Sequence, residues 1–120
     1  MPHITLEISE NITINNPKML LNKLNQALFA TGHFRQINDI KSRIYYPTLS
    51  LVGDDWQAGF AAVTLKLLAG RTTQIKNNLV ETVLNVLQDE FAQDDYDKIS
   101  VQCSVEILEL SDNYQKMAVS

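Results

Sequence analysis

The sequence predicts an α+β protein with two layers, in which two helices lie on one face of a four-stranded sheet. Three observations lead to this fold class. Four segments have the apolar pattern of strands, two segments repeat apolar residues at helical spacing, and their order is strand–helix–strand twice over. Each half is typical of a crossover unit that joins two parallel strands, and such units are almost always right-handed.

The first half is predicted from alternation and from helix end signals. Apolar side chains occupy every second position of the segment His3 to Ser9, and Pro2 has the same parity. A helix is expected next, because Asn16 is a good N-cap, Pro17 suits the first helical turn and Thr31-Gly32 provides a stop. The apolar residues of this helix recur at helical spacing: Leu20, Leu21, Leu24, Ala27 and Leu28.

The second half is predicted from apolar segments separated by turn residues. We expect strands from Ile40 to Leu51, with a bend at its proline, from Gly59 to Leu68 and from Ile99 to Leu110. A helix is expected from Thr73 to Phe91, and a polar tail from Ser111 to Ser120. The apolar stripe of the second helix comprises Ile75, Leu79, Val83, Val86, Leu87 and Phe91.

Size and charge exclude several classes of protein. At 120 residues the chain is expected to form a single domain, residues 1–120. The net charge is −4 and no basic run is present, which argues against a nucleic-acid partner. No apolar run approaches the roughly 20 residues that span a membrane, and no signal-peptide pattern opens the chain. The one cysteine suits a reducing compartment, so we expect a cytoplasmic protein.

The sequence offers no metal or cofactor site. His3, His33 and Cys103 are too few to supply the four ligands of a structural zinc ion. No glycine-rich phosphate loop is present either. We therefore expect an activity that depends on neither a metal nor a cofactor.

Association with other copies is expected from the sheet. Two helices can cover one of its faces, while the other face reads as partly apolar, through Phe60, Ala62 and Val63 and through Val101 to Ile107. A large uncovered apolar face usually marks an interface. The pattern thus predicts a homo-oligomer.

The second residue carries the most specific chemical signal. A small residue after Met1 allows the methionine to be removed, which would leave Pro2 with a free secondary amine. An α-amino group has a pKa of about 8, and burial lowers that pKa because it disfavours the charged form. A neutral amine in a pocket is a good general base. The structural alternative is a proline that only begins a strand.

Ordered sequence blocks extend this signal over nearly the whole chain, which resembles the 5-carboxymethyl-2-hydroxymuconate isomerase family of the tautomerase superfamily. The blocks are Met1-Pro2-His3, Glu7, Ser9-Glu10-Asn11-Ile12, Ala30-Thr31-Gly32-His33-Phe34, Ile40-Lys41-Ser42-Arg43, Val63-Thr64-Leu65-Lys66, Ala69-Gly70-Arg71 and Glu106-Ile107-Leu108-Glu109-Leu110. The tail Asp112-Asn113-Tyr114-Gln115-Lys116 matches loosely.

The resemblance implies a homotrimer and an enzyme that ketonises a dienol carrying several carboxylates, in the breakdown of homoprotocatechuate. It implies that Pro2 is the base and that Arg71 and Arg43 bind the substrate. Lys41 stands where the family has a further arginine, and it is also expected to bind the substrate, with a point charge in place of a planar fork suited to carboxylates.

Two other readings stay open at this stage. The chain could be a non-catalytic trimer that binds a small carboxylate or acts as an interaction module. It could also be a promiscuous tautomerase for another 2-hydroxy enol acid. A free N-terminal proline separates enzyme from module, and a requirement for a second carboxylate separates the specific isomerase from the promiscuous one.

Overall fold

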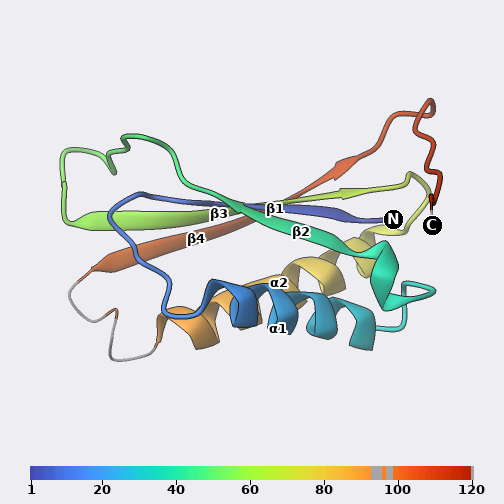
Figure 1. The fold of residues 1–120 in the computed structure, drawn as a ribbon, viewed down its shortest axis with the longest axis horizontal. Helices are drawn as coiled ribbons and strands as arrows, with labels where there is room; N and C mark the ends of the chain where they lie inside the picture. The colour runs from blue at the N-terminus through green and yellow to red at the C-terminus, as the bar shows by residue number, and fades with distance from the viewer. Residues whose placement is uncertain (93–95, 97–98, 120) are drawn as a thin grey trace.

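The structure, a computed structural model, describes residues 1–92, 96 and 99–119 as two layers, with both helices on one face of a sheet (Figure 1). The predicted order of strands and helices is confirmed, and one short 3₁₀ helix, η1, is added before the second strand. The elements are β1 (His3–Ile8), α1 (Pro17–Ala30), η1 (Ile37–Asp39), β2 (Lys41–Tyr45), β3 (Ala58–Leu67), α2 (Thr73–Phe91) and β4 (Ser100–Glu109).

Strand pairing joins two parallel units into one sheet of order β2-β1-β3-β4. β1 pairs in parallel with β2, β3 pairs in parallel with β4, and β1 runs antiparallel to β3. His3 pairs with both Lys41 and Lys66, so the starts of β1 and β2 meet the end of β3. Both chain termini lie at this same end of the sheet (Figure 1).

Both helices have the end signals expected from the sequence. The Asn16 side chain accepts a hydrogen bond from the Met19 amide at 3.1 Å, and Pro17 occupies the first helical turn. Gly32, just past the end of α1, has a φ of +82°, a conformation that favours glycine. The Thr72 hydroxyl caps α2 by accepting from the Ile75 amide at 3.2 Å.

The core lies between the sheet and the two helices. Both helices bury the central residues of their predicted apolar stripes, and neither is long and apolar enough, within the described chain, to cross a membrane. The sheet residues of the core cluster are Ile4, Leu6, Ile8, Ala61, Val63, Leu65 and Leu67, and its leucines and valine from the helices are Leu20, Leu24, Leu28, Leu79, Val83 and Leu87.

The prediction for the second strand was too long. β2 ends at Tyr45, which pairs with Glu7, one residue before the end of β1. Beyond this point β1 offers almost no further backbone partners, and Pro47 lacks the amide that a ladder needs. The following segment to β3 is a loop that contains an isolated bridge between Val52 and Asp55.

The prediction of an apolar uncovered sheet face was right for Phe60 and Ala62 but wrong for Val63 and for the predicted apolar residues of β4. Val63 is 2% exposed on the helix side, and its partner Val105 packs partly against the same core. So do the β4 residues of the same parity, Val101, Cys103 and Ile107. Because side chains alternate across a strand, the uncovered face carries mostly polar residues instead. By register these include His3, Thr5, Glu7, Lys41, Arg43, Thr64, Lys66, Gln102, Ser104 and Glu106. By the same register Tyr45, Phe60, Ala62 and Leu108 also lie on this face, so its apolar part is smaller than predicted and the homo-oligomer stays a prediction.

Candidate active site

A pocket of about 620 Å³ lies at the end of the sheet where β1 and β2 begin and β3 ends. Three of its side chains are cationic and one is anionic. The terminal amine adds a further group that is positive when protonated, so the pocket favours anions. Its lining residues are Met1, His33, Phe34, Arg35, Gln36, Asp39, Leu68, Arg71 and Lys116.

The start of the chain is held firmly beside this pocket. Pro2 is buried, and its carbonyl accepts a hydrogen bond from the Lys41 amide at 3.1 Å. Burial lowers the pKa of the Met1 amine below its ordinary value, and the charges of Arg71, Lys116 and Lys41 lower it further against the opposing effect of Asp39. An amine at this position is therefore driven toward its neutral form.

Arg71 faces the same pocket from the connection between β3 and α2. Gly70 has a φ of +114°, which lets the chain turn sharply just before Arg71. The Arg71 guanidinium lies over the Phe34 ring, 5.1 Å from its centroid, and donates weakly, at 3.4 Å, to the His33 and Leu68 carbonyls. Stacking and two long bonds orient a planar group with five N–H donors, so donors remain for an anion.

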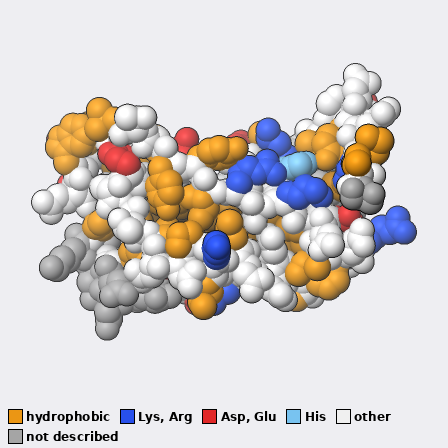
Figure 2. Space-filling view, viewed as in Figure 1, with side chains coloured by type: hydrophobic (Ala, Val, Ile, Leu, Met, Phe, Trp, Pro, Cys, Tyr) orange, Lys and Arg blue, Asp and Glu red, His pale blue; other side chains and the backbone are white. Residues whose placement is uncertain are grey.

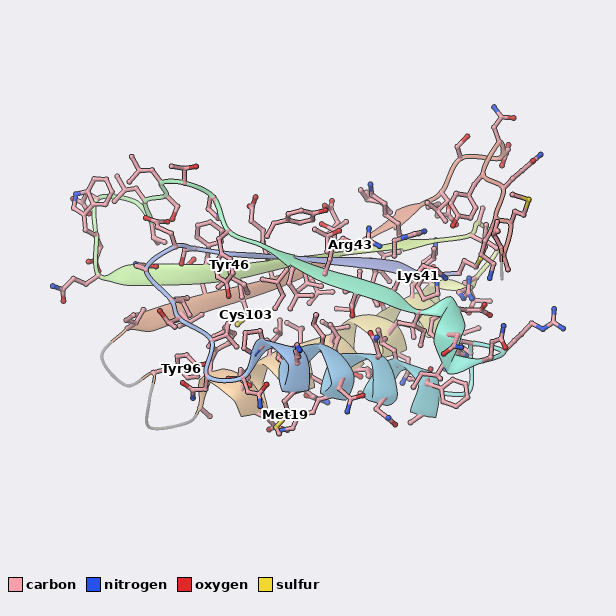
Figure 3. The ribbon with its side chains drawn as sticks, in the orientation of Figure 1. Met19, Lys41, Arg43, Tyr46, Tyr96 and Cys103 are labelled. Carbon is pink, nitrogen blue, oxygen red and sulfur yellow. The ribbon has the colours of Figure 1, made fainter. Side chains whose placement is uncertain are left out.

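Lys41 and Arg43 lie on β2 but face different surroundings (Figure 3). The Lys41 ammonium donates to the carbonyls of Asn38 and Asp39, each at 3.2 Å, at the end of η1. It does not line the pocket, although its charge acts on the Met1 amine. Arg43 donates instead to a histidine on the uncovered face of the sheet. The structure thus brings Arg71 and the chain start together, with Lys41 adjoining and Arg43 apart.

His3, Arg43 and Tyr114 form a second polar group, which we call the uncovered-face cluster. Arg43 Nη2 lies 2.9 Å from His3 Nδ1, and His3 Nε2 lies 2.8 Å from the Tyr114 hydroxyl oxygen. Because arginine can only donate, Nδ1 accepts and Nε2 carries the proton that it donates to Tyr114. Burial lowers the pKa of His3, and the Arg43 charge lowers it further, which keeps the ring neutral.

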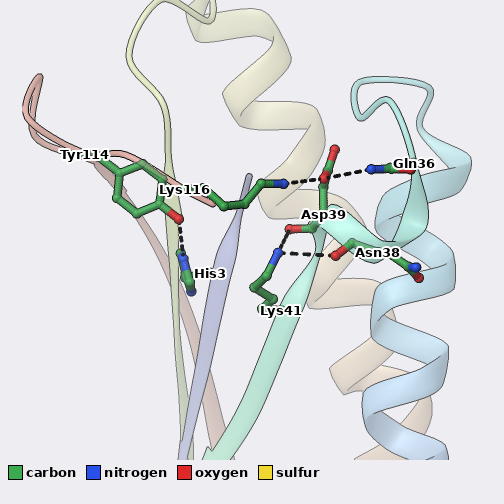
Figure 4. Close-up of polar contacts among 7 residues, drawn as sticks. All are labelled: His3, Gln36, Asn38, Asp39, Lys41, Tyr114 and Lys116. Atoms are coloured by element: carbon green, nitrogen blue, oxygen red, sulfur yellow. Dashed lines mark hydrogen bonds and ion pairs between the residues drawn. The ribbon is translucent and has the colours of Figure 1, made fainter. Parts of the chain in front are cut away.

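Three charged residues of the pocket were missed by the sequence analysis: Arg35, Asp39 and Lys116. Lys116 Nζ lies 2.8 Å from Asp39 Oδ1, and the Gln36 amide donates to the same oxygen at 3.3 Å (Figure 4). The bond from Lys116 holds the pKa of Asp39 below its ordinary value. Lys116 lies in the tail, and no periodicity in the sequence indicated where that tail would fold.

Figure 2 shows Lys and Arg side chains gathered beside a histidine toward the end of the molecule where both termini lie. Within the part of the chain that the structure describes, no three His, Cys, Asp or Glu side chains are grouped to hold a metal ion. At this end of the sheet an amine of lowered pKa lies beside cationic side chains.

A family model described as 5-carboxymethyl-2-hydroxymuconate isomerase matches residues 2–119. The chain belongs to this family. A crystal structure of a 5-carboxymethyl-2-hydroxymuconate isomerase from Deinococcus radiodurans R1 is 28% identical and superposes with a TM-score of 0.84, covering 96% of this chain and 88% of that one. Like other 5-carboxymethyl-2-hydroxymuconate isomerase family members, the chain is an isomerase of the tautomerase superfamily.

Two further structures share the fold at lower identity. A 5-carboxymethyl-2-hydroxymuconate delta-isomerase is 18% identical with a TM-score of 0.83, covering 99% of this chain and 89% of that one. A fused 4-OT wild-type symmetric trimer is also 18% identical, with a TM-score of 0.69 and coverage of 97% and 91%. A search of curated protein sequences found no match. These likenesses establish the tautomerase fold of this family member.

Proposed function

We propose that this isomerase ketonises a carboxylated dienol such as 5-carboxymethyl-2-hydroxymuconate, in homoprotocatechuate breakdown, with Pro2 as the general base. The observation that carries the proposal is the start of the chain, which lies beside a pocket with three cationic side chains and a terminal amine of lowered pKa. Family membership supports the same class of reaction.

Pro2 can act as a base only after Met1 has been removed, because the nitrogen of a Met–Pro bond is an amide. The freed nitrogen would be a secondary amine at the start of β1, next to the cations that now surround Met1. Their charge and the low solvent exposure would keep it neutral. It would accept the proton of the enol hydroxyl and return a proton to carbon, which yields the ketone with no change in composition and no cofactor.

Cations would orient the substrate and stabilise the charge that develops on its oxygen. Arg71 is proposed to bind one carboxylate through its planar fork, which lies over the Phe34 ring. Positive charge in the pocket would also stabilise an enolate oxygen. Lys41 and Arg43 are proposed as further carboxylate ligands, with Lys41 acting as a point charge.

The active assembly is proposed to be a homotrimer. Each subunit has two edge strands, β2 and β4, and a sheet face without helices, and a structure with the same fold is described as a symmetric trimer. Arg43 lies on that uncovered face and does not line the pocket of its own subunit. In the trimer it would therefore contact substrate bound in the pocket of a neighbouring subunit. The single cysteine, Cys103, remains our reason to propose a cytoplasmic location.

The test compares methionine-free protein, verified by intact mass, with a matched preparation that retains Met1. Ultraviolet absorbance would follow the loss of a dienol tricarboxylate in both. We expect fast turnover from the methionine-free protein alone. Equal turnover from both would rule out Pro2 as the base. Binding without turnover by either form would favour a non-catalytic trimeric binding module, and equal turnover of a monocarboxylate enol would favour a promiscuous tautomerase.

A further inference from the structure

We propose that Lys116 is a specificity-determining residue, because its ammonium group cancels the charge of Asp39 and keeps the pocket positive for a polycarboxylate. The inference rests on the proposed function, since it concerns which enol acids that pocket accepts. It assigns a role to the C-terminal tail, which carries Lys116 from the far end of the chain to the start of β1.

The contact between these two side chains is short and partly shielded. Lys116 Nζ and Asp39 Oδ1 are 2.8 Å apart, with side-chain exposures of 34% and 13%. Both residues line the pocket, so the carboxylate would otherwise present its charge to the ligand. Without its partner, the Asp39 carboxylate would repel a ligand carboxylate bound in the same pocket.

The balance of charge in the pocket depends on this pair. Arg35 and Arg71 are the other cationic side chains that line it. With Lys116 present, Asp39 is neutralised and both arginines are available to the ligand. Without Lys116, one arginine is offset by Asp39. The loss should therefore grow with each carboxylate on the ligand.

The tail is anchored independently of Lys116. The Leu110 amide donates to the Leu67 carbonyl at 2.6 Å, where the tail leaves the sheet. Farther along, the Tyr114 hydroxyl bonds to His3 at 2.8 Å (Figure 4). These contacts should hold the tail in place when Lys116 is replaced, so a change in affinity would report charge and not the loss of the pocket wall.

The experiment uses methionine-free enzyme and four variants: Lys116→Gln, Lys116→Arg, Asp39→Asn and the double variant Lys116→Gln/Asp39→Asn. For Lys116→Gln we expect KM to rise about tenfold for a tricarboxylate dienol and about threefold for a monocarboxylate enol, with kcat within about twofold of wild type. Lys116→Arg should retain most of the affinity. Adding Asp39→Asn to Lys116→Gln should restore most of it, because no charge is left to cancel.

Equal rises in KM for the two substrates would overturn the proposal, as would a double variant no better than Lys116→Gln. A binding measurement separates this outcome from failure of the proposed function. Calorimetric titration with propane-1,2,3-tricarboxylate needs no turnover. If wild type binds this probe but converts no enol, the proposed function fails, while weaker binding by Lys116→Gln and rescue by Asp39→Asn would still support Lys116. Unchanged binding of the probe by Lys116→Gln, or no binding of the probe by wild type, would overturn the proposed role of Lys116.

Discussion

The pocket and the uncovered-face cluster lie at the same end of the sheet, yet their arginines have different surroundings. Arg71 stacks on Phe34 and faces a hollow of about 620 Å³. Arg43 donates to His3 on the sheet face that no helix covers. The same side chain is thus open to a ligand in one place and engaged by a protein partner in the other. The role of each arginine therefore depends on whether it faces an open pocket or a protein partner.

The difference arises from strand alternation and from the turn after β3. Residues of β1 and β2 with the parity of His3 point to the uncovered face, which takes Arg43 away from the core side. Arg71 lies beyond the end of β3, where Gly70 allows the chain to turn toward the start of β1. Four substitutions, in order of decreasing expected effect, test this contrast between the two regions.

The largest effect is expected at the start of the chain. Replacing Pro2 by Ala in methionine-free protein should lower kcat for ketonisation by about 10²-fold, because a primary amine replaces the proposed secondary amine base. Stopped-flow absorbance measures the rate, and circular dichroism checks that the sheet and helices are retained. Undiminished turnover in a folded variant would exclude Pro2 as the base.

A smaller loss is expected in the pocket wall. Arg71→Ala should reduce kcat/KM for a carboxylated dienol by about 10- to 100-fold, because it removes a charge-assisted contact to the substrate. Arg71→Lys is the matched control and should recover only part, since lysine keeps the charge and loses the planar fork. Wild-type kinetics in Arg71→Ala would remove this residue from the site.

Arg43→Ala sharpens the comparison from the other side. We expect KM to rise about threefold, less than for Arg71→Ala, because Arg43 must give up its bond to His3 before it can bind a carboxylate. The pKa of His3 should increase in this variant, since a positive neighbour that lowers it is gone. Nuclear magnetic resonance titration of the imidazole measures that shift. A KM increase as large as that of Arg71→Ala would contradict the expectation, because it would mean that the bond to His3 does not weaken the contact of Arg43 with the substrate.

The smallest effect concerns stability and pH. The pKa of His3 is lowered in the folded protein from its ordinary value of 6.5. Below that value the unfolded chain binds more protons, so stability should fall as pH drops from about 7 to 5. His3→Gln should flatten this dependence, with a difference in Tm of about 1–3 °C at pH 5. An unchanged slope in thermal melts across this range would show that His3 does not contribute.

Local signals predicted much of the fold. Asn16, Pro17 and Gly32 bound α1 as expected, and the range predicted for α2 matches Thr73–Phe91. Such signals act through neighbouring residues: a cap accepts from an amide three positions on, and a stripe follows the helical period. Pro2 and Arg71 were singled out because both stand in short blocks that resemble the family, and their roles in the reaction stay predictions.

Tertiary structure decided what depends on partners distant in the chain. β2 ends at the residue that pairs with Glu7, because only one further residue of β1 remains to pair with it. Cys103 packs toward the helices because of its register with β3. Asp39 and Lys116 are separated by 77 positions, so no local pattern could have joined them. Periodicity is a property of the chain itself, whereas the face that becomes the core and the tail that closes a pocket are set by strand pairing and packing.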